Sequence, residues 1–142
     1  MIIKMDEMRV SVVPSGVEAL VSAGHRVLIE RNAGSGAGFL DQAYEQAGAE
    51  LMLDGQAVWG QADLIVKVKE PLPLEYGLMR AEQTIFTFLH LAAAPELAVA
   101  LASKKAVAVA YETIQQTDRS LPLLEPMSEI AGKMSIQVGA SF

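Results

Sequence analysis

The sequence predicts an α/β domain: an open, mostly parallel β-sheet flanked by helices. Short runs rich in valine, isoleucine and leucine alternate along the chain with short segments of helical periodicity. Such alternation is typical of β–α–β units, whose strands run parallel and whose helices cover both faces of the sheet. The length of 142 residues fits one domain, and no internal repeat, linker or low-complexity segment divides the chain.

The first half of the chain contains clear helix boundaries. Pro14 suits the first turn of a helix, and Gly24 suits its C-terminal cap. Asp41 can cap a second helix, which Gly48 closes. We expect helices at 14–23, 41–47 and 54–60, and strands at 26–30, 50–53 and 63–68.

The second half continues the same alternation. The run at 84–89 is the most apolar of the expected strands, which predicts burial on both of its faces. Ser128 stands as the N-cap of the last helix, with Glu129 in its first turn. We expect helices at 74–79, 95–103 and 128–139, strands at 84–89 and 106–111, and a polar surface loop or hairpin tip at 115–120.

Composition excludes several classes of protein. Apolar residues make up 51% of the chain and charged residues 20%, so disorder is excluded as its dominant state. The absence of cysteine excludes disulfides, thiolate nucleophiles and zinc ribbons. Two histidines and dispersed acidic residues predict no metal site.

The net charge and the hydropathy of the chain limit the kinds of partner that it can bind. The 11 basic and 17 acidic side chains leave a net charge of −6, which would repel nucleic acid. The apolar runs are far shorter than the ~20 residues needed to cross a bilayer. The start of the chain does not resemble a signal peptide. We therefore expect a cytoplasmic protein with a small-molecule or protein partner.

A cluster of glycines is the first candidate site. Gly34, Gly36 and Gly38 follow the expected strand at 26–30, as the glycines of a dinucleotide-binding turn would. That fingerprint requires its third glycine three residues after the second, where this chain has Phe39. We therefore favour a flexible strand-to-helix turn over a nucleotide site.

A stronger candidate lies where two expected strands end. Lys69 follows the strand at 63–68, and His90 follows the strand at 84–89. In an open parallel sheet, the ligand crevice lies at the carboxyl ends of the strands. An ammonium and an imidazole in one crevice could bind a carboxylate or carbonyl and move a proton. The alternative is a solvated lysine and a structural histidine. Arg9 suits bidentate carboxylate binding, but by itself it is indistinguishable from a surface arginine.

Longer segments carry a specific resemblance. They are RVSVVPSGVEALVSAGHRVLIE, AGSGAGF, YEQAGAEL, VWGQADLIVKVKEPLPLEY, FTFLHLA, AYET and LPLLEPMSEIAGKMSIQVGA, which together cover most of the chain from Arg9 onward. These segments resemble the N-terminal domain of alanine dehydrogenases, a family that includes the nicotinamide nucleotide transhydrogenases. KVKEP together with FTFLHLA resembles alanine dehydrogenase rather than transhydrogenase.

The resemblance implies a function and a set of site residues. It implies a Rossmann-like or flavodoxin-like substrate domain and the reversible, NAD-dependent oxidative deamination of L-alanine to pyruvate and ammonia. It implies that Arg9 and Lys69 hold the substrate carboxylate and carbonyl and that His90 is the general acid/base. It also implies that Ser128 contacts the cofactor. The family's hexameric habit and the apolar face of the last helix make a homo-oligomer a reasonable expectation.

Two departures from the family pattern modify these expectations. Between Ile3 and Arg9 the chain is several residues shorter than the family pattern MIIGVPKEIKNNENRV, which predicts a shortened first strand and an altered loop around Arg9. The resemblance also implies a separate NAD-binding domain, which residues 1–142 do not contain. We therefore expect an incomplete substrate domain that by itself is inactive and binds no NAD. The alternatives are a non-catalytic ligand-binding or interaction module and a degraded gene product, each retaining the fold.

Overall fold

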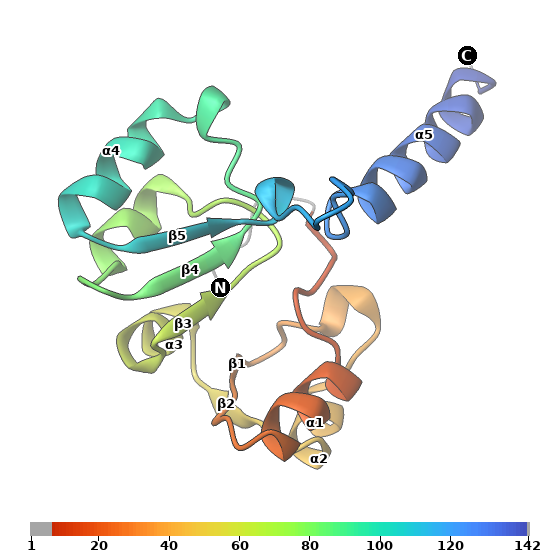
Figure 1. Cartoon of the computed structure of the whole chain (residues 1–142). Coiled ribbons are helices and arrows are strands. Elements are labelled where there is room, and N and C mark those ends of the chain that lie inside the picture. The colour runs from red at the N-terminus through yellow and green to blue at the C-terminus, as the bar shows by residue number, and fades with distance from the viewer. Residues whose placement is uncertain (1–6, 142) are drawn as a thin grey trace.

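Two sets of parallel strands organise the computed structural model, which describes residues 7–141 (Figure 1). The expected shortened first strand falls outside this range. The helices are α1 (Pro14–Ser22), α2 (Asp41–Gln46), α3 (Gly55–Gln61), α4 (Pro95–Lys104) and α5 (Glu125–Gly139). The strands are β1 (Leu28–Glu30), β2 (Glu50–Met52), β3 (Leu64–Val66), β4 (Thr84–Thr87) and β5 (Val107–Ala110). Short 3₁₀ helices occupy Ser35–Ala37, Pro73–Leu78, Leu91–Ala93 and Tyr111–Thr113.

The strands form two separate ladders, and every pairing is parallel. β1 pairs with β2, while the larger ladder has the order β3–β4–β5. In the larger ladder Val66 lies opposite Phe86, and Thr87 lies opposite Ala110. The predicted open, parallel α/β fold is therefore confirmed. The register also brings the carboxyl ends of the three strands to one edge.

The main core lies between the larger ladder and its helices. α3 supplies Trp59 and α4 supplies Leu97 and Leu101, which cluster with Ile65 and Ile85 from the strands. Each of these side chains is at most 5% exposed. Burying one large apolar side chain contributes about 1.5–3 kcal/mol, so this cluster holds β3 and β4 together.

β4 corrects one expectation about burial. Ile85 and Thr87 are buried, whereas Thr84 and Phe86 on the other face are only half-buried. The predicted burial on both faces therefore holds for one face and only in part for the other. The ring of Tyr111 covers part of the half-buried face. It packs edge-on against the Phe86 ring, with the two ring centroids 4.3 Å apart.

Helix starts also differ from the expectations. The Asp54 carboxylate caps α3 by accepting the Ala57 N–H at 2.8 Å. Asp41, expected as a cap, is instead the first residue of α2, because its carboxylate accepts the N–H of Asn32 at 2.7 Å. The expected helix at 74–79 is a 3₁₀ helix.

The last helix begins earlier than predicted. α5 starts at Glu125, and the Ser128 N–H bonds the Leu124 carbonyl at 3.0 Å, so Ser128 lies within the first turn and is not the N-cap. Pro126 permits this earlier start, because proline lacks only an N–H that a first turn leaves unpaired.

α5 extends away from the rest of the fold (Figure 1). None of its residues is buried, and Ile130, Met134 and Val138 are each about half exposed along one face. In the part of the chain that the structure describes, no helix is long and apolar enough to span a membrane.

Candidate functional site

The carboxyl ends of β3 and β4 lie at the same edge of the larger ladder. Thr87, fully buried at the end of β4, donates its hydroxyl hydrogen to the Lys69 carbonyl oxygen at 2.9 Å. His90 follows three residues after Thr87, and its Nδ1 lies 3.9 Å from Oε2 of Glu70, the neighbour of Lys69. The structure therefore places Lys69 and His90 at the same edge, which was the geometric basis of the sequence argument.

His90 has an unusual backbone. Its φ of 48° and ψ of 40° lie in the left-handed region, which residues with a Cβ rarely adopt. The Glu112 carboxylate accepts the N–H groups of Leu89 at 3.1 Å and of His90 at 2.7 Å. The imidazole lies 5.8 Å from the Phe88 ring, and the side chain is 52% exposed. The imidazole is thus accessible to a ligand while its backbone is held.

Arg9 is held by a carboxylate along one edge of its guanidinium group. Nε and Nη2 donate to the two oxygens of Glu7 at 2.7 and 2.6 Å. These hydrogen bonds hold the pKa of Glu7 below its ordinary value, and the charge of Lys69 lowers it further. Nη1 points instead toward the Met127 sulfur at 3.2 Å. Because Glu7 takes the Nε–Nη2 edge, a second carboxylate would meet the Nη1–Nη2 edge, where Nη1 contacts the Met127 sulfur.

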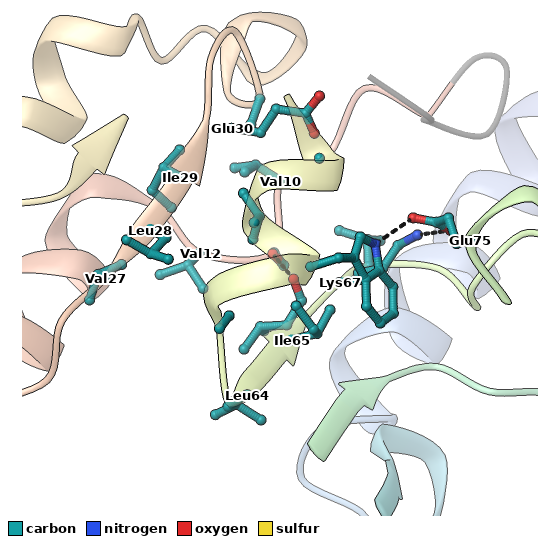
Figure 2. A pocket seen from close by; sticks show the side chains of 18 of the residues that line it. Val10, Val12, Val27, Leu28, Ile29, Glu30, Leu64, Ile65, Lys67 and Glu75 are labelled. Carbon is teal, nitrogen blue, oxygen red and sulfur yellow. Dashed lines mark hydrogen bonds and ion pairs between the residues drawn. The ribbon is translucent and has the colours of Figure 1, made fainter. Parts of the chain in front are cut away.

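A buried carboxylate anchors the loop that carries Lys69. Glu75 is 4% exposed and accepts hydrogen bonds from Trp59 Nε1 at 3.2 Å and from the Leu72 N–H at 2.7 Å. It also forms an ion pair with Lys67 (Figure 2). Because Lys67 and Leu72 lie on either side of Lys69, the Glu75 carboxylate binds residues at both ends of this loop.

A cavity of about 530 Å³ lies between β1 and β3. Apolar side chains form most of its walls, with Leu28 and Ile29 on the β1 side and Leu64 and Ile65 on the β3 side (Figure 2). The charged residues that line it beside the Lys69 loop include Glu7, Arg9, Lys69 and Glu70. The structure therefore brings the two cations predicted to hold a substrate to one cavity.

The other two predicted site residues lie outside the lining of this cavity. His90 is next to the cavity through Glu70, as described above. Ser128 is exposed on the first turn of α5, one residue after Met127, which contacts Arg9. The start of α5 therefore lies beside Arg9, but the geometry does not place the Ser128 side chain among the cations.

The glycine segment does not fit a dinucleotide. A Cβ on Gly34 would lie 2.6 Å from the Tyr44 ring, and one on Gly36 would lie 3.1 Å from the Met8 backbone. These glycines let the turn at 34–38 pack tightly against its own fold, so they leave no open cradle for a pyrophosphate. Among residues 7–141, no group of three or more histidine or acidic side chains could hold a metal ion.

Several carboxylates that shape the site were missed by sequence reasoning. Glu112 could have been found by the rule that selected Lys69 and His90, because it follows the carboxyl end of β5. Glu7 lies two residues before Arg9, which is compatible with a local ion pair without requiring one. Glu75 had no local signal, since only the turn at Pro73–Leu78 returns it to Lys67.

Comparisons with known proteins agree with this architecture. The family described as "Alanine dehydrogenase/PNT, N-terminal domain" matches residues 3–131. Alanine dehydrogenase of Methanococcus maripaludis is 54% identical over 140 residues, which cover 99% of this chain and 38% of that protein. Alanine dehydrogenase of Bacillus subtilis is 55% identical over 140 residues, covering 99% of this chain and 36% of that protein. The chain thus spans less than two fifths of the length of these relatives.

Solved structures show the same relationship. An L-alanine dehydrogenase structure matches with a TM-score of 0.93 and 54% identity, covering 98% of this chain and 38% of the other. A transhydrogenase structure from Sinorhizobium meliloti matches with a TM-score of 0.76 and 29% identity, over 82% of this chain and 33% of the other. The chain therefore belongs to the alanine dehydrogenase/PNT N-terminal domain family.

Proposed function

We propose that residues 1–142 form the substrate-binding part of an NAD-dependent alanine dehydrogenase, which interconverts L-alanine with pyruvate and ammonia. The observation that carries this proposal is the pairing of Arg9 and Lys69 at one cavity, with His90 at the same sheet edge. The name and high identity of the relatives support the reaction class.

Each side chain has a proposed task. The Nη1–Nη2 edge of the Arg9 guanidinium group binds the substrate carboxylate through two parallel hydrogen bonds, which replace the weak contact of Nη1 with the Met127 sulfur. The Lys69 ammonium group binds the carbonyl oxygen of pyruvate, where its positive charge stabilises negative charge as that oxygen is polarised. The exposed imidazole of His90 exchanges a proton with the reacting centre. Glu7 supports this arrangement because it fixes Arg9 without covering the edge that binds substrate.

The cofactor is proposed to meet this part of the protein at one place. NAD would accept or donate the hydride, and Ser128 would contact it from the exposed first turn of α5. The close approach of Gly34 to Tyr44 and of Gly36 to Met8 supports a packed turn in the glycine segment rather than a pyrophosphate cradle. We therefore propose that the 142-residue chain alone binds the 2-oxo acid and does not reduce NAD. A non-catalytic ligand-binding module is the alternative that these contacts favour.

Titration with pyruvate tests the substrate site. In ¹⁵N-labelled chain we expect shifts of amides near Lys69 and Arg9, with a dissociation constant in the millimolar range, about −4 kcal/mol. Lys69→Ala should abolish these shifts. Lys133→Ala is the matched control, because Lys133 is exposed on α5 and pairs with its helix neighbour Glu129. Pyruvate shifts that persist in Lys69→Ala would contradict the proposed site.

An absorbance assay separates the enzyme from the binding module. The chain is mixed with L-alanine and NAD, and NADH formation is followed. Binding of pyruvate without NADH formation is the expected result for these residues alone. Steady NADH production that disappears in His90→Ala would show that they form a complete active site.

A further inference from the structure

We propose that Glu112 is a positioning residue for His90. Its carboxylate accepts the N–H groups of Leu89 and His90 and thereby anchors the two peptide groups that lead into the left-handed residue, from which the imidazole projects. The inference rests on the proposed function of His90 as the group that exchanges a proton with the substrate. Glu112 itself does not touch the substrate in this scheme.

The backbone geometry creates the need for such a residue. At φ 48° and ψ 40°, the Cβ of His90 is crowded by its own backbone, so this conformation persists only where neighbouring groups stabilise it. The imidazole is 52% exposed, so packing of the side chain supplies only part of that stabilisation. Contacts to the backbone supply the rest, and Glu112 provides two of them at the N–H groups of Leu89 and His90.

The hydrogen bonds explain how the carboxylate acts. In an extended strand, successive N–H groups point to opposite sides, so one acceptor cannot reach both. Here Glu112 Oε1 receives the N–H of His90 at 2.7 Å and that of Leu89 at 3.1 Å, while Oε2 lies 3.3 Å from the Leu89 nitrogen. The backbone of Leu89, which joins the two peptide groups that carry these N–H groups, turns both toward one anion just before the left-handed residue, and hydrogen bonds to a charged acceptor are stronger than neutral ones.

The fold delivers Glu112 to this position. β5 is in register with β4 so that Ala110 lies opposite Thr87, and Glu112 lies two residues beyond Ala110 in the 3₁₀ turn Tyr111–Thr113. The Tyr111 ring packs edge-on against Phe86 at 4.3 Å and against Phe88 at 5.0 Å. The turn is therefore anchored on the residues that lead to His90.

The consequence is a defined place for the imidazole. With this backbone, Nδ1 lies 3.9 Å from Glu70 Oε2, next to Lys69, and the ring lies beside Phe88. If His90 adopted an extended backbone, its Cβ would point in a different direction and the imidazole would leave this edge. Glu112 thus affects the proposed reaction indirectly, because it orients the imidazole of His90.

Hydrogen exchange measured by NMR tests the backbone contact. In Glu112→Ala the amides of Leu89 and His90 should exchange about tenfold faster or more, because each loses a charge-assisted hydrogen bond. The amides of Lys67 and Val107, which bond to the Phe86 and Gln83 carbonyls within the ladder, should keep their protection. Glu112→Gln retains a carbonyl oxygen and should restore part of the protection. Glu45→Ala, on the exposed surface of α2, is the matched control.

The imidazole itself provides the second readout. The chain has only two histidines, so the imidazole signals of His90 are assigned as the set that disappears in His90→Gly. In the unmodified chain, pyruvate should shift the His90 imidazole signals. In Glu112→Ala it should still shift amides near Lys69 but lose its effect on His90, with partial recovery in Glu112→Gln.

A double variant tests the link to backbone strain. Glycine adopts the left-handed region without steric cost, so His90→Gly should reduce the loss of stability caused by Glu112→Ala. Equal losses in both backgrounds would overturn the proposal, as would unchanged exchange at Leu89 and His90 in Glu112→Ala. So would a His90 response to pyruvate that Glu112→Ala does not alter. If pyruvate fails to shift His90 in the unmodified chain, the proposed function fails, and the exchange and double-variant data alone decide the backbone contact.

Discussion

The hydroxyl of Thr87 and the carbonyl oxygen of Lys69 are joined by a 2.9 Å hydrogen bond, which couples the exit of β4 to the loop after β3. Thr87 is fully buried, so this bond lies out of water. Thr87 and Lys69 are 18 positions apart in the sequence. Their hydrogen bond fixes the distance between the Lys69 loop and the segment that joins β4 to His90.

Thr87→Val should destabilise the chain while preserving the shape of its core. The valine leaves the Lys69 carbonyl without its hydroxyl partner, which costs about 1–3 kcal/mol. Urea unfolding followed by the fluorescence of the single tryptophan, Trp59, measures this loss. Thr113→Val is the control, because the Thr113 hydroxyl is exposed and bonds only within its own turn. Equal stability of the Thr87 and Thr113 variants would contradict the coupling.

Glu75→Gln should cause a larger loss, about 3–5 kcal/mol, because it leaves the partly buried ammonium group of Lys67 without its counter-charge. Adding Lys67→Met removes the orphaned charge and should recover part of the stability. Both variants are measured by urea unfolding. The exposed pair Lys133–Glu129 provides the comparison, since Glu129→Gln should cost no more than about 0.5 kcal/mol. Absence of recovery in the double variant would argue against the charge explanation.

The Glu7–Arg9 pair should produce an acid-sensitive contribution to stability. Hydrogen bonds from Arg9 hold the pKa of Glu7 below its ordinary value of 4.5. The pair therefore stabilises the fold above pH 4.5, and this contribution is lost as pH falls through the lower pKa of the folded state. Glu7→Gln should flatten the stability profile in this range. Glu50→Gln should have a smaller effect, because its pair with Arg26 is exposed and screened by water.

Tyr111 should produce the opposite pH dependence at the alkaline end. Burial raises its pKa to about 12 from an ordinary value of 10.0. Above pH 10 the folded state therefore holds this proton more tightly than the unfolded chain, so stability falls as pH rises toward 12. Phenolate absorbance should show one tyrosine that ionises near this value. Tyr111→Phe should remove the late step and reduce the alkaline loss of stability, whereas Tyr76→Phe should leave the late step in place.

The topology could be predicted because it depends on local patterns. Alternating apolar runs and helix boundaries such as Pro14 identified the parallel α/β fold, and a topological rule placed Lys69 and His90 together. The ends of elements were less predictable where side chains compete for the same donors. The start of α5 at Glu125 illustrates this, because the Glu125 carboxylate accepts the Leu121 N–H at 3.0 Å and supports a turn before Ser128.

The supporting carboxylates depend on long-range geometry. Glu112 reaches His90 across 22 positions of sequence, and Glu75 reaches Trp59 across 16. No periodicity identifies which of many acidic residues will face a backbone N–H group in the folded chain. The left-handed conformation of His90 could not be predicted either, since histidine adopts it more often than most residues with a Cβ but still in only a small share of cases. The residues proposed to bind the substrate could therefore be predicted from the sequence, whereas the carboxylates that position them could not.

The strands are separated into two ladders, which we expect to unfold as two units. Lys69 and His90 both follow strands of the larger ladder. Arg9 lies in the segment between the two ladders, where the Ser11 hydroxyl donates to the Val66 carbonyl at 3.1 Å. Small ladders of this kind can open at a lower free energy than the whole molecule. Partial opening at this segment would displace Arg9 while the larger ladder keeps its fold. Affinity for a carboxylate should then decline with temperature before the Trp59 core melts.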